Sequence, residues 1–479
     1  MDHSSNENNS APENREPESG LFADQLGTRD LAVSTVANIG PGIDFYFGFG
    51  IIVATAGVGA PLTIVAAAIA VSLLAWTTAE FTRAEPSAGS FITYIESGFG
   101  NSAGAWAALL VTVGYTVAMA GVITMTGGFV SMTVMRFAHV SVPWIGPTLL
   151  ISVVGLVLMT RGVKLSTKIV AIALAIQVGV MVLVCVITLA QEPAHLNLAP
   201  FTWGNISGGL AGLSAGFPLA LYMFIGWENG PALAEEARNP TRSVPRALAI
   251  SVGVASVLFL LFAYSTIIGF HENVTSVGRS SIPFLTVADR ALGPVAFLAW
   301  IAGIASILAT FIAGTTSQAR MIFDGGREGF LPRRLGVAHP RHGTPVAALG
   351  LIVASGLVII VGWWVAHVIG AGTGSMDPVG LYAECSTIGT MIILVVYAAT
   401  NLSLPVFIVR QHREHFSIVR HVGVPLLGTA ALIIPFIELF TPGQPAPYSA
   451  YPYVTLVIIV GAGVWVGLSA RHRQRRKAR

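Results

Sequence analysis

Two apolar segments of this 479-residue chain are each interrupted by helix-breaking residues and an acid. The first contains Gly40-Pro41-Gly42, followed by Asp44; the second contains Gly226-Trp227-Glu228, followed by another glycine and a proline. Proline removes a backbone donor and clashes with the preceding helical turn, and glycine has little helical preference. We therefore expect both helices to unwind there, which frees N–H and C=O groups for an anionic and a cationic ligand group. For the first break alone, a simple proline kink is the alternative.

The elements that carry these breaks must lie in a membrane. Only 10% of the residues are charged, against about 25% in an average soluble protein, and 54% are hydrophobic. This composition excludes soluble, disordered, collagen-like and disulfide-scaffold classes. The two cysteines, Cys185 and Cys385, lie in apolar runs without a CxxC pair and give no support to a metal or redox site. We predict an all-α polytopic membrane protein with no cofactor and no metal.

A bilayer core about 30 Å thick requires about 20 apolar residues per helix. This length criterion predicts twelve transmembrane helices, at approximately residues 31–56, 62–81, 103–129, 144–159, 169–190, 210–234, 248–270, 291–321, 345–365, 383–407, 424–439 and 454–469.

Basic residues predict the orientation of these helices. If the N-terminus is cytoplasmic, all but three of the 26 Lys and Arg residues lie inside, the exceptions being Arg136, Arg279 and Arg290. We therefore expect a multi-pass protein of the cell membrane with both termini in the cytoplasm. Residues 1–28 are expected to form a disordered tail rather than a signal peptide. The basic tail 471–479 is expected to touch anionic lipid and not nucleic acid.

Short motifs occur in order along about residues 30 to 410. They are Ile39-Gly40-Pro41-Gly42-Ile43, Ala79-Glu80-Phe81, Pro86-Ser87-Ala88-Gly89-Ser90, Gly162-Val163-Lys164-Leu165-Ser166, Phe224-Ile225-Gly226-Trp227-Glu228, Ala234-Glu235-Glu236, Asn239-Pro240, Arg320, Gly329-Phe330-Leu331-Pro332, Gly343-Thr344-Pro345, Ala383-Glu384 and Ile388-Gly389-Thr390. In this ordered set the sequence resembles the amino acid–polyamine–organocation superfamily of permeases.

The resemblance implies a LeuT-type fold with helices 1 and 6 unwound at mid-membrane. The transporter core would span residues 29–410, with inverted repeats of five helices at about 29–191 and 207–410, and residues 411–470 would add helices 11 and 12. It also implies secondary active transport of amino acids or related amines by alternating access. Interrupted helices in corresponding positions of two halves are the sequence pattern of such a transporter.

The resemblance also implies a substrate site. The substrate carboxylate would meet backbone groups of the first break, and its ammonium would meet carbonyls of the second. These groups belong to Ile39, Gly40, Pro41 and Gly42, and to Phe224, Ile225 and Gly226. Tyr222 and Trp227 would act as gates; for Tyr222 the alternative is a tyrosine that only packs in the bundle.

Three polar residues need separate interpretation. Asp44, where the family more often has an apolar or aromatic residue, suggests a cationic substrate or a carboxyl that changes protonation; the alternative is a helix cap. Glu228 is a candidate proton-coupling group. Gln177 stands where some relatives have a lysine that replaces sodium, and it cannot titrate. Ser306 and Thr310 could contribute to a sodium site, so H⁺ and Na⁺ both remain open.

Glu235 and Glu236 are expected at the cytoplasmic end of the sixth helix, where the helix dipole disfavours acids. We predict an inner gate in which the two acids pair with arginines, for which Arg320, Arg327 and Arg333 are the candidates. The alternative is a solvated loop.

Other classes fit less well. A channel would need rings of charge or filter carbonyls, whereas the two broken helices point to one occluded site. An enzyme would need a metal cluster or a nucleophile–base set, and the sequence contains neither an HExxH nor a GxSxG motif. A polyamine or other organocation transporter, and a substrate sensor on a transporter fold, remain alternatives. The substrate and the oligomeric state are open.

Overall fold

The computed structural model describes residues 20–371, 377–440 and 448–477. Within these ranges the chain is helical, and its one β-type contact is an isolated bridge between Leu26 and Ala237. Residues 1–19 of the expected tail, and the last two of the basic tail, lie outside the described residues. The predicted disorder is wrong for residues 20–28. Leu21 and Leu26 are buried, and two backbone amides there donate to the Glu236 carbonyl.

The first half of the chain forms one broken helix and four continuous long ones. The broken helix consists of α1 (Thr28–Ile39) and α2 (Pro41–Ala56). The others are α3 (Ala60–Ala84), α5 (Asn101–Ala138), α6 (Ile145–Thr160) and α7 (Val163–Gln191), with the short α4 (Phe91–Phe99) between α3 and α5.

The second half repeats this order. Its broken helix consists of α8 (Leu210–Tyr222) and α9 (Asn229–Ala232), and it continues with α10 (Pro240–Gly269), α13 (Phe297–Arg327), α14 (Val346–Ala371) and α15 (Pro378–Gln411). The short α11 (Val274–Arg279) and α12 (Pro283–Leu292) lie between α10 and α13, and α16 (Val424–Leu439) and α17 (Tyr451–Lys477) follow.

Eight helical stretches among the described residues are long and apolar enough to cross a membrane, and three shorter apolar helices accompany them. The longest stretch, Thr28–Ala84, contains α1 to α3. Every segment predicted from hydropathy overlaps one of these stretches. The predicted start of the eighth, residue 291, is wrong, because Gly293 adopts a positive φ of 52° and the long helix begins only at Phe297.

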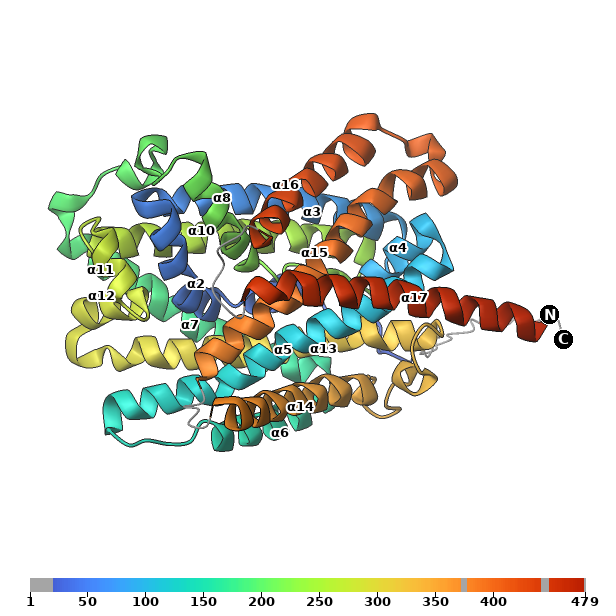
Figure 1. Ribbon diagram of the computed structural model, residues 1–479, viewed down its shortest axis with the longest axis horizontal. Helices are drawn as coiled ribbons and strands as arrows, with labels where there is room; N and C mark the ends of the chain where they lie inside the picture. Colours follow the sequence, from blue (N-terminus) through green and yellow to red (C-terminus); the bar gives the residue numbers. More distant parts are fainter. Residues whose placement is uncertain (1–19, 372–376, 441–447, 478–479) are drawn as a thin grey trace, which may run out of the picture.

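Figure 1 shows α4 at one end of the molecule and α11 and α12 at the other. We call these ends the inner and outer faces, after the predicted orientation. The most extensive contacts join α5 to α15, α7 to α13 and α3 to α10. Small residues allow the close approach of α5 and α15: a Cβ added to Gly389 would lie 2.7 Å from the Ala118 Cβ.

Candidate functional site

The first predicted break is present at Gly40. This residue has φ 67°, in the left-handed region; its N–H donates to the carbonyls of Val36 and Ala37 and so ends α1. Pro41 then occupies the first turn of α2, where its missing N–H costs nothing. The helix therefore ends and restarts, which excludes the alternative of a simple proline kink.

Hydroxyl groups of α13 bond to the freed backbone. The amides of Gly42 and Ile43 donate to the Ser306 Oγ at 3.1 and 2.9 Å, and the Thr310 hydroxyl donates to the Ala37 carbonyl at 3.0 Å. Ser306 thus occupies amides of the segment that the resemblance assigns to a substrate carboxylate. Gln177 is fully buried and, within the described part of the chain, its side-chain amide has no hydrogen-bond partner.

The second break lies between Tyr222 and Asn229, where Gly226 has φ 107°. The Glu228 carboxylate accepts a hydrogen bond from the Gly226 N–H at 2.9 Å and from the Tyr115 hydroxyl at 2.6 Å. Glu228 is only 1% exposed, so it holds the unwound segment against α5. The Asn38 side chain donates to the Gly226 carbonyl at 3.1 Å and joins the two breaks directly.

A small cavity of about 40 Å³ lies at the two breaks. Of the predicted residues, its lining contains Asp44, Tyr222, Ile225 and Gly226. The lining does not include Ile39, Gly40, Pro41, Gly42, Phe224, Trp227, Glu228, Glu235 or Glu236.

Two of those residues pack elsewhere. The ring of Phe224 lies 5.1 Å from that of Phe259 on α10. Trp227 packs at 6.1 Å from Phe91 and 5.4 Å from Tyr397, so it forms part of an aromatic cluster beside the cavity.

Four polar residues that line the cavity were not predicted as site residues: Asn38, Tyr115, Gln318 and Thr390. The Gln318 Oε1 and the Thr390 Oγ are buried, and no described group satisfies either of them by hydrogen bonding. For Gln318 the only signal in the sequence was polarity within an apolar run, which many packing residues share, whereas Thr390 ends the motif Ile388-Gly389-Thr390.

Tyrosine hydroxyls form a hydrogen-bonded group beside the cavity. Tyr382 donates to Asp44 Oδ1 at 2.7 Å, and the Tyr222 hydroxyl lies 2.9 Å from that of Tyr382 and 2.8 Å from the Ser386 Oγ. Phe47 packs against the Tyr382 ring at 5.9 Å. Asp44 lies in the first turn of α2, where the helix dipole favours an acid, but its carboxylate bonds to Tyr382 and makes no side-chain cap.

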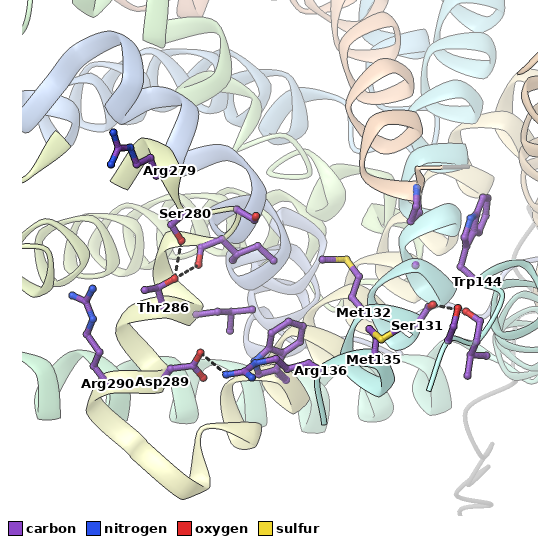
Figure 2. Close-up of a pocket in the computed structure, with 18 of the residues that line it drawn as sticks. Ser131, Met132, Met135, Arg136, Trp144, Arg279, Ser280, Thr286, Asp289 and Arg290 are labelled. Carbon is purple, nitrogen blue, oxygen red and sulfur yellow. Dashed lines mark hydrogen bonds and ion pairs between the residues drawn. The ribbon is translucent and has the colours of Figure 1, made fainter. Parts of the chain in front are cut away.

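A vestibule of about 1100 Å³ lies at the outer face, between the outer end of α5 and α11 to α13. The three arginines predicted outside, Arg136, Arg279 and Arg290, all line it (Figure 2). Arg136 pairs with Asp289 at 3.2 Å, and Arg290 donates to the Gly269 carbonyl at 2.9 Å. The vestibule is therefore basic, a feature that the residue count alone did not reveal.

Two ion pairs follow the second break, on the inner side of the molecule. Arg320 binds both carboxylate oxygens of Glu236, with each side chain only 1% exposed, and also donates to the Thr316 carbonyl at 2.7 Å. Arg327 binds both oxygens of Glu235 at 2.9 and 2.7 Å. The predicted pairing is confirmed for these two arginines, and the solvated-loop alternative is wrong. The third candidate, Arg333, lies in the turn Arg333–Gly336.

Comparison with known proteins now has this geometry beside it. A family model described as "Amino acid permease" matches residues 26–464. The chain belongs to the amino acid permease family. It is 26% identical to a branched-chain amino acid permease of Bacillus subtilis over 87% of each chain. It is also similar to the vacuolar cationic amino acid transporter 4 of Arabidopsis thaliana (26%, 69% of this chain and 58% of the relative). The human Asc-type amino acid transporter 1 is 28% identical (59% of this chain, 55% of the relative).

Membership in the family makes this permease a multi-pass membrane transporter of amino acids and not an enzyme, as the motifs predicted. The relatives' names refer to branched-chain and cationic amino acids, so membership leaves the substrate of this permease undecided.

Proposed function

We propose that this permease is a secondary active transporter that moves amino acids or related amines across the cell membrane by alternating access. The observation that carries the proposal is the small cavity at the two helix breaks, lined by Asp44 and by Gln318 and Thr390, whose side-chain oxygens are unsatisfied. Buried polar atoms without partners are costly, and a bound polar ligand would remove that cost.

The size of the cavity supports a closed state between two open ones. About 40 Å³ has room for roughly three water molecules and not for an amino acid. Substrate entry therefore requires the walls to part, on the outer side by separation of Tyr222 and Tyr382, or on the inner side by separation of Arg320 from Glu236.

The proposed architecture is twelve transmembrane helices with two inverted repeats, 29–191 and 207–410, followed by helices at 411–470. A shift by five helices relates α3 to α10, α5 to α13, α6 to α14 and α7 to α15. This shift exchanges the contact pairs α5–α15 and α13–α7, and it maps the pairs α3–α10 and α6–α14 onto themselves. The short α4 and the pair α11–α12 fall at equivalent positions and at opposite ends of the molecule (Figure 1).

Within this architecture we assign the substrate carboxylate to the first break and the substrate ammonium to the second. Asp44 favours a substrate that carries an additional cationic group, or a carboxyl that takes up a proton during the cycle. Glu228 is the second candidate for proton coupling, whereas Ser306 and Thr310, bonded to the first break, are candidates for a sodium site. Both termini are assigned to the cytoplasm.

Reconstitution into liposomes tests the proposal. Radiolabelled neutral amino acids, basic amino acids and polyamines are offered with and without pH and Na⁺ gradients. We expect saturable uptake of one class, driven by one of the gradients, and at least a tenfold loss of uptake in Asp44→Asn if the substrate is cationic. Uptake of no class while a substrate still binds would overturn transport in favour of a sensor.

A further inference from the structure

Three side chains with metal-binding groups converge on the outer face, away from the cavity. They are Glu192, which ends α7, His195 in the 3₁₀ turn that follows, and His271, just beyond the end of α10. The Nδ1 of His195 and the Nε2 of His271 each lie 3.0 Å from the same oxygen, Oε2 of Glu192. The ligand atoms of all three residues lie within 4.8 Å of one another.

The geometry fits a tetrahedral ion. Zinc bonds to imidazole nitrogen and carboxylate oxygen are about 2.0 to 2.2 Å long, which places neighbouring ligand atoms of a tetrahedron about 3.4 Å apart. The two nitrogen–oxygen separations are close to this value. The two imidazole rings stack with their centroids 4.2 Å apart, and each has a nitrogen 3.0 Å from the same carboxylate oxygen.

The surroundings suit a cation that arrives from solvent. The three side chains are 30 to 51% exposed, which leaves a fourth position open to water. Glu272 adds a second carboxylate nearby and is held by Asn197 at 2.5 Å. The positive charge of Arg290 lies close to this turn too, bonded to Gly269, so the local charge is not purely negative.

We propose that Glu192, His195 and His271 form a binding site for a divalent transition-metal ion, with Zn²⁺ the best match. Two imidazoles and one carboxylate with an open fourth position are a zinc ligand set, whereas Ca²⁺ and Mg²⁺ require oxygen ligands. The bound ion would join the end of α7 to the end of α10. Because the ion would bind the folded protein and not the unfolded chain, it would stabilise this arrangement of the outer face.

The test uses the purified full-length protein in detergent, freed of metal and of any polyhistidine tag, and titrates it with Zn²⁺ in a calorimeter. We expect one saturable site per chain, at least tenfold weaker binding in His195→Ala, His271→Ala and Glu192→Gln, and no comparable binding of Mg²⁺ or Ca²⁺. Zn²⁺ should raise the melting temperature of the wild type and not that of the variants.

A matched control exists at another surface. Among the described residues, His339 and His342 form a second stacked histidine pair, with ring centroids 5.0 Å apart. The double variant His339→Ala/His342→Ala should bind Zn²⁺ like the wild type. Binding that survives His195→Ala/His271→Ala, or the absence of binding by the wild type at millimolar Zn²⁺, would overturn the proposal. Because the readouts are binding and melting, either result is independent of whether the protein transports amino acids.

Discussion

Two regions flank the helix breaks: ion pairs lie on the inner side, whereas hydroxyl groups surround Asp44 on the outer side. Inside, Arg320 and Glu236 are almost completely buried and bind each other through two hydrogen bonds. Outside, Asp44 has a tyrosine as its partner, and a vestibule of about 1100 Å³ lies on that face of the molecule.

This difference in chemistry predicts a difference in the cost of opening. Separating a buried ion pair leaves charges without compensation unless water enters, and removal of one partner typically costs about 3 to 5 kcal/mol. A hydrogen bond to a charged group contributes about 1.5 to 3 kcal/mol. We therefore expect the closed structure to open outward more readily than inward.

The largest effect is expected from Arg320→Ala, which leaves the buried Glu236 carboxylate without its cation. We expect a loss of about 3 to 5 kcal/mol of stability and of most transport, measured as the melting temperature in detergent and as uptake into liposomes. The double variant Arg320→Met/Glu236→Met removes both charges and should regain most of the stability. If the double variant regains stability but not transport, the ion pair between Arg320 and Glu236 takes part in the transport cycle. A single variant as stable as the wild type would contradict a closure based on this ion pair.

An intermediate effect is expected from Tyr382→Phe, which removes the hydroxyl that binds Asp44. The lost hydrogen bond contributes about 1.5 kcal/mol or more to keeping the outer side closed. Without it, the cavity should be open to the vestibule about tenfold more often. The measurement is the rate at which a membrane-impermeant maleimide, added to intact cells, labels Thr390→Cys in a background without Cys185 and Cys385.

Tyr46→Phe is the matched control for this experiment. It removes a hydroxyl from the same helix as Asp44, but that hydroxyl bonds to the Ala299 carbonyl at 2.8 Å and not to the carboxylate. Equal labelling rates in the two variants would show that the bond to Asp44 does not keep the outer side closed.

The smallest effect is expected at Glu96 on α4, at the inner face. Burial, together with the neighbouring carboxylates of Glu328, Asp324 and Glu85, raises the pKa of Glu96 to about 7. The folded state thus retains a proton that the unfolded chain releases near pH 4.5, so stability falls as the pH rises from about 5 through 7.

Glu96→Gln resembles the protonated form and should lose this part of the pH dependence. Melting temperatures at pH 5.5 and pH 8 should differ by a few degrees less in the variant than in the wild type, because the side chain is partly exposed and the effect is small. Glu414→Gln, an exposed carboxyl outside this group, serves as control. An unchanged pH profile in Glu96→Gln would contradict the assignment.

Sequence reasoning was most successful where a backbone rule acts locally. The helices break at Gly40 and at the Gly226 segment as predicted, because glycine and proline weaken a helix locally. The pairing of Glu235 and Glu236 with arginines also followed, since acids at a helix C-terminus need cations. The cavity lining was harder. Gln318 and Thr390 come from helices far along the chain, and a polar residue in an apolar run reveals nothing about which helix it faces.

The amino-acid sequence alone determined that this protein is a helical membrane permease and where two of its helices break. These properties depend on residue type and on spacing within a single helix. Only the tertiary structure decided that Ser306 binds the first break, that Tyr382 binds Asp44, and that His195 and His271 share one carboxylate. Each of these contacts joins residues from different helices or from turns far apart in the chain, and only the packing of the helices brings them within hydrogen-bond distance.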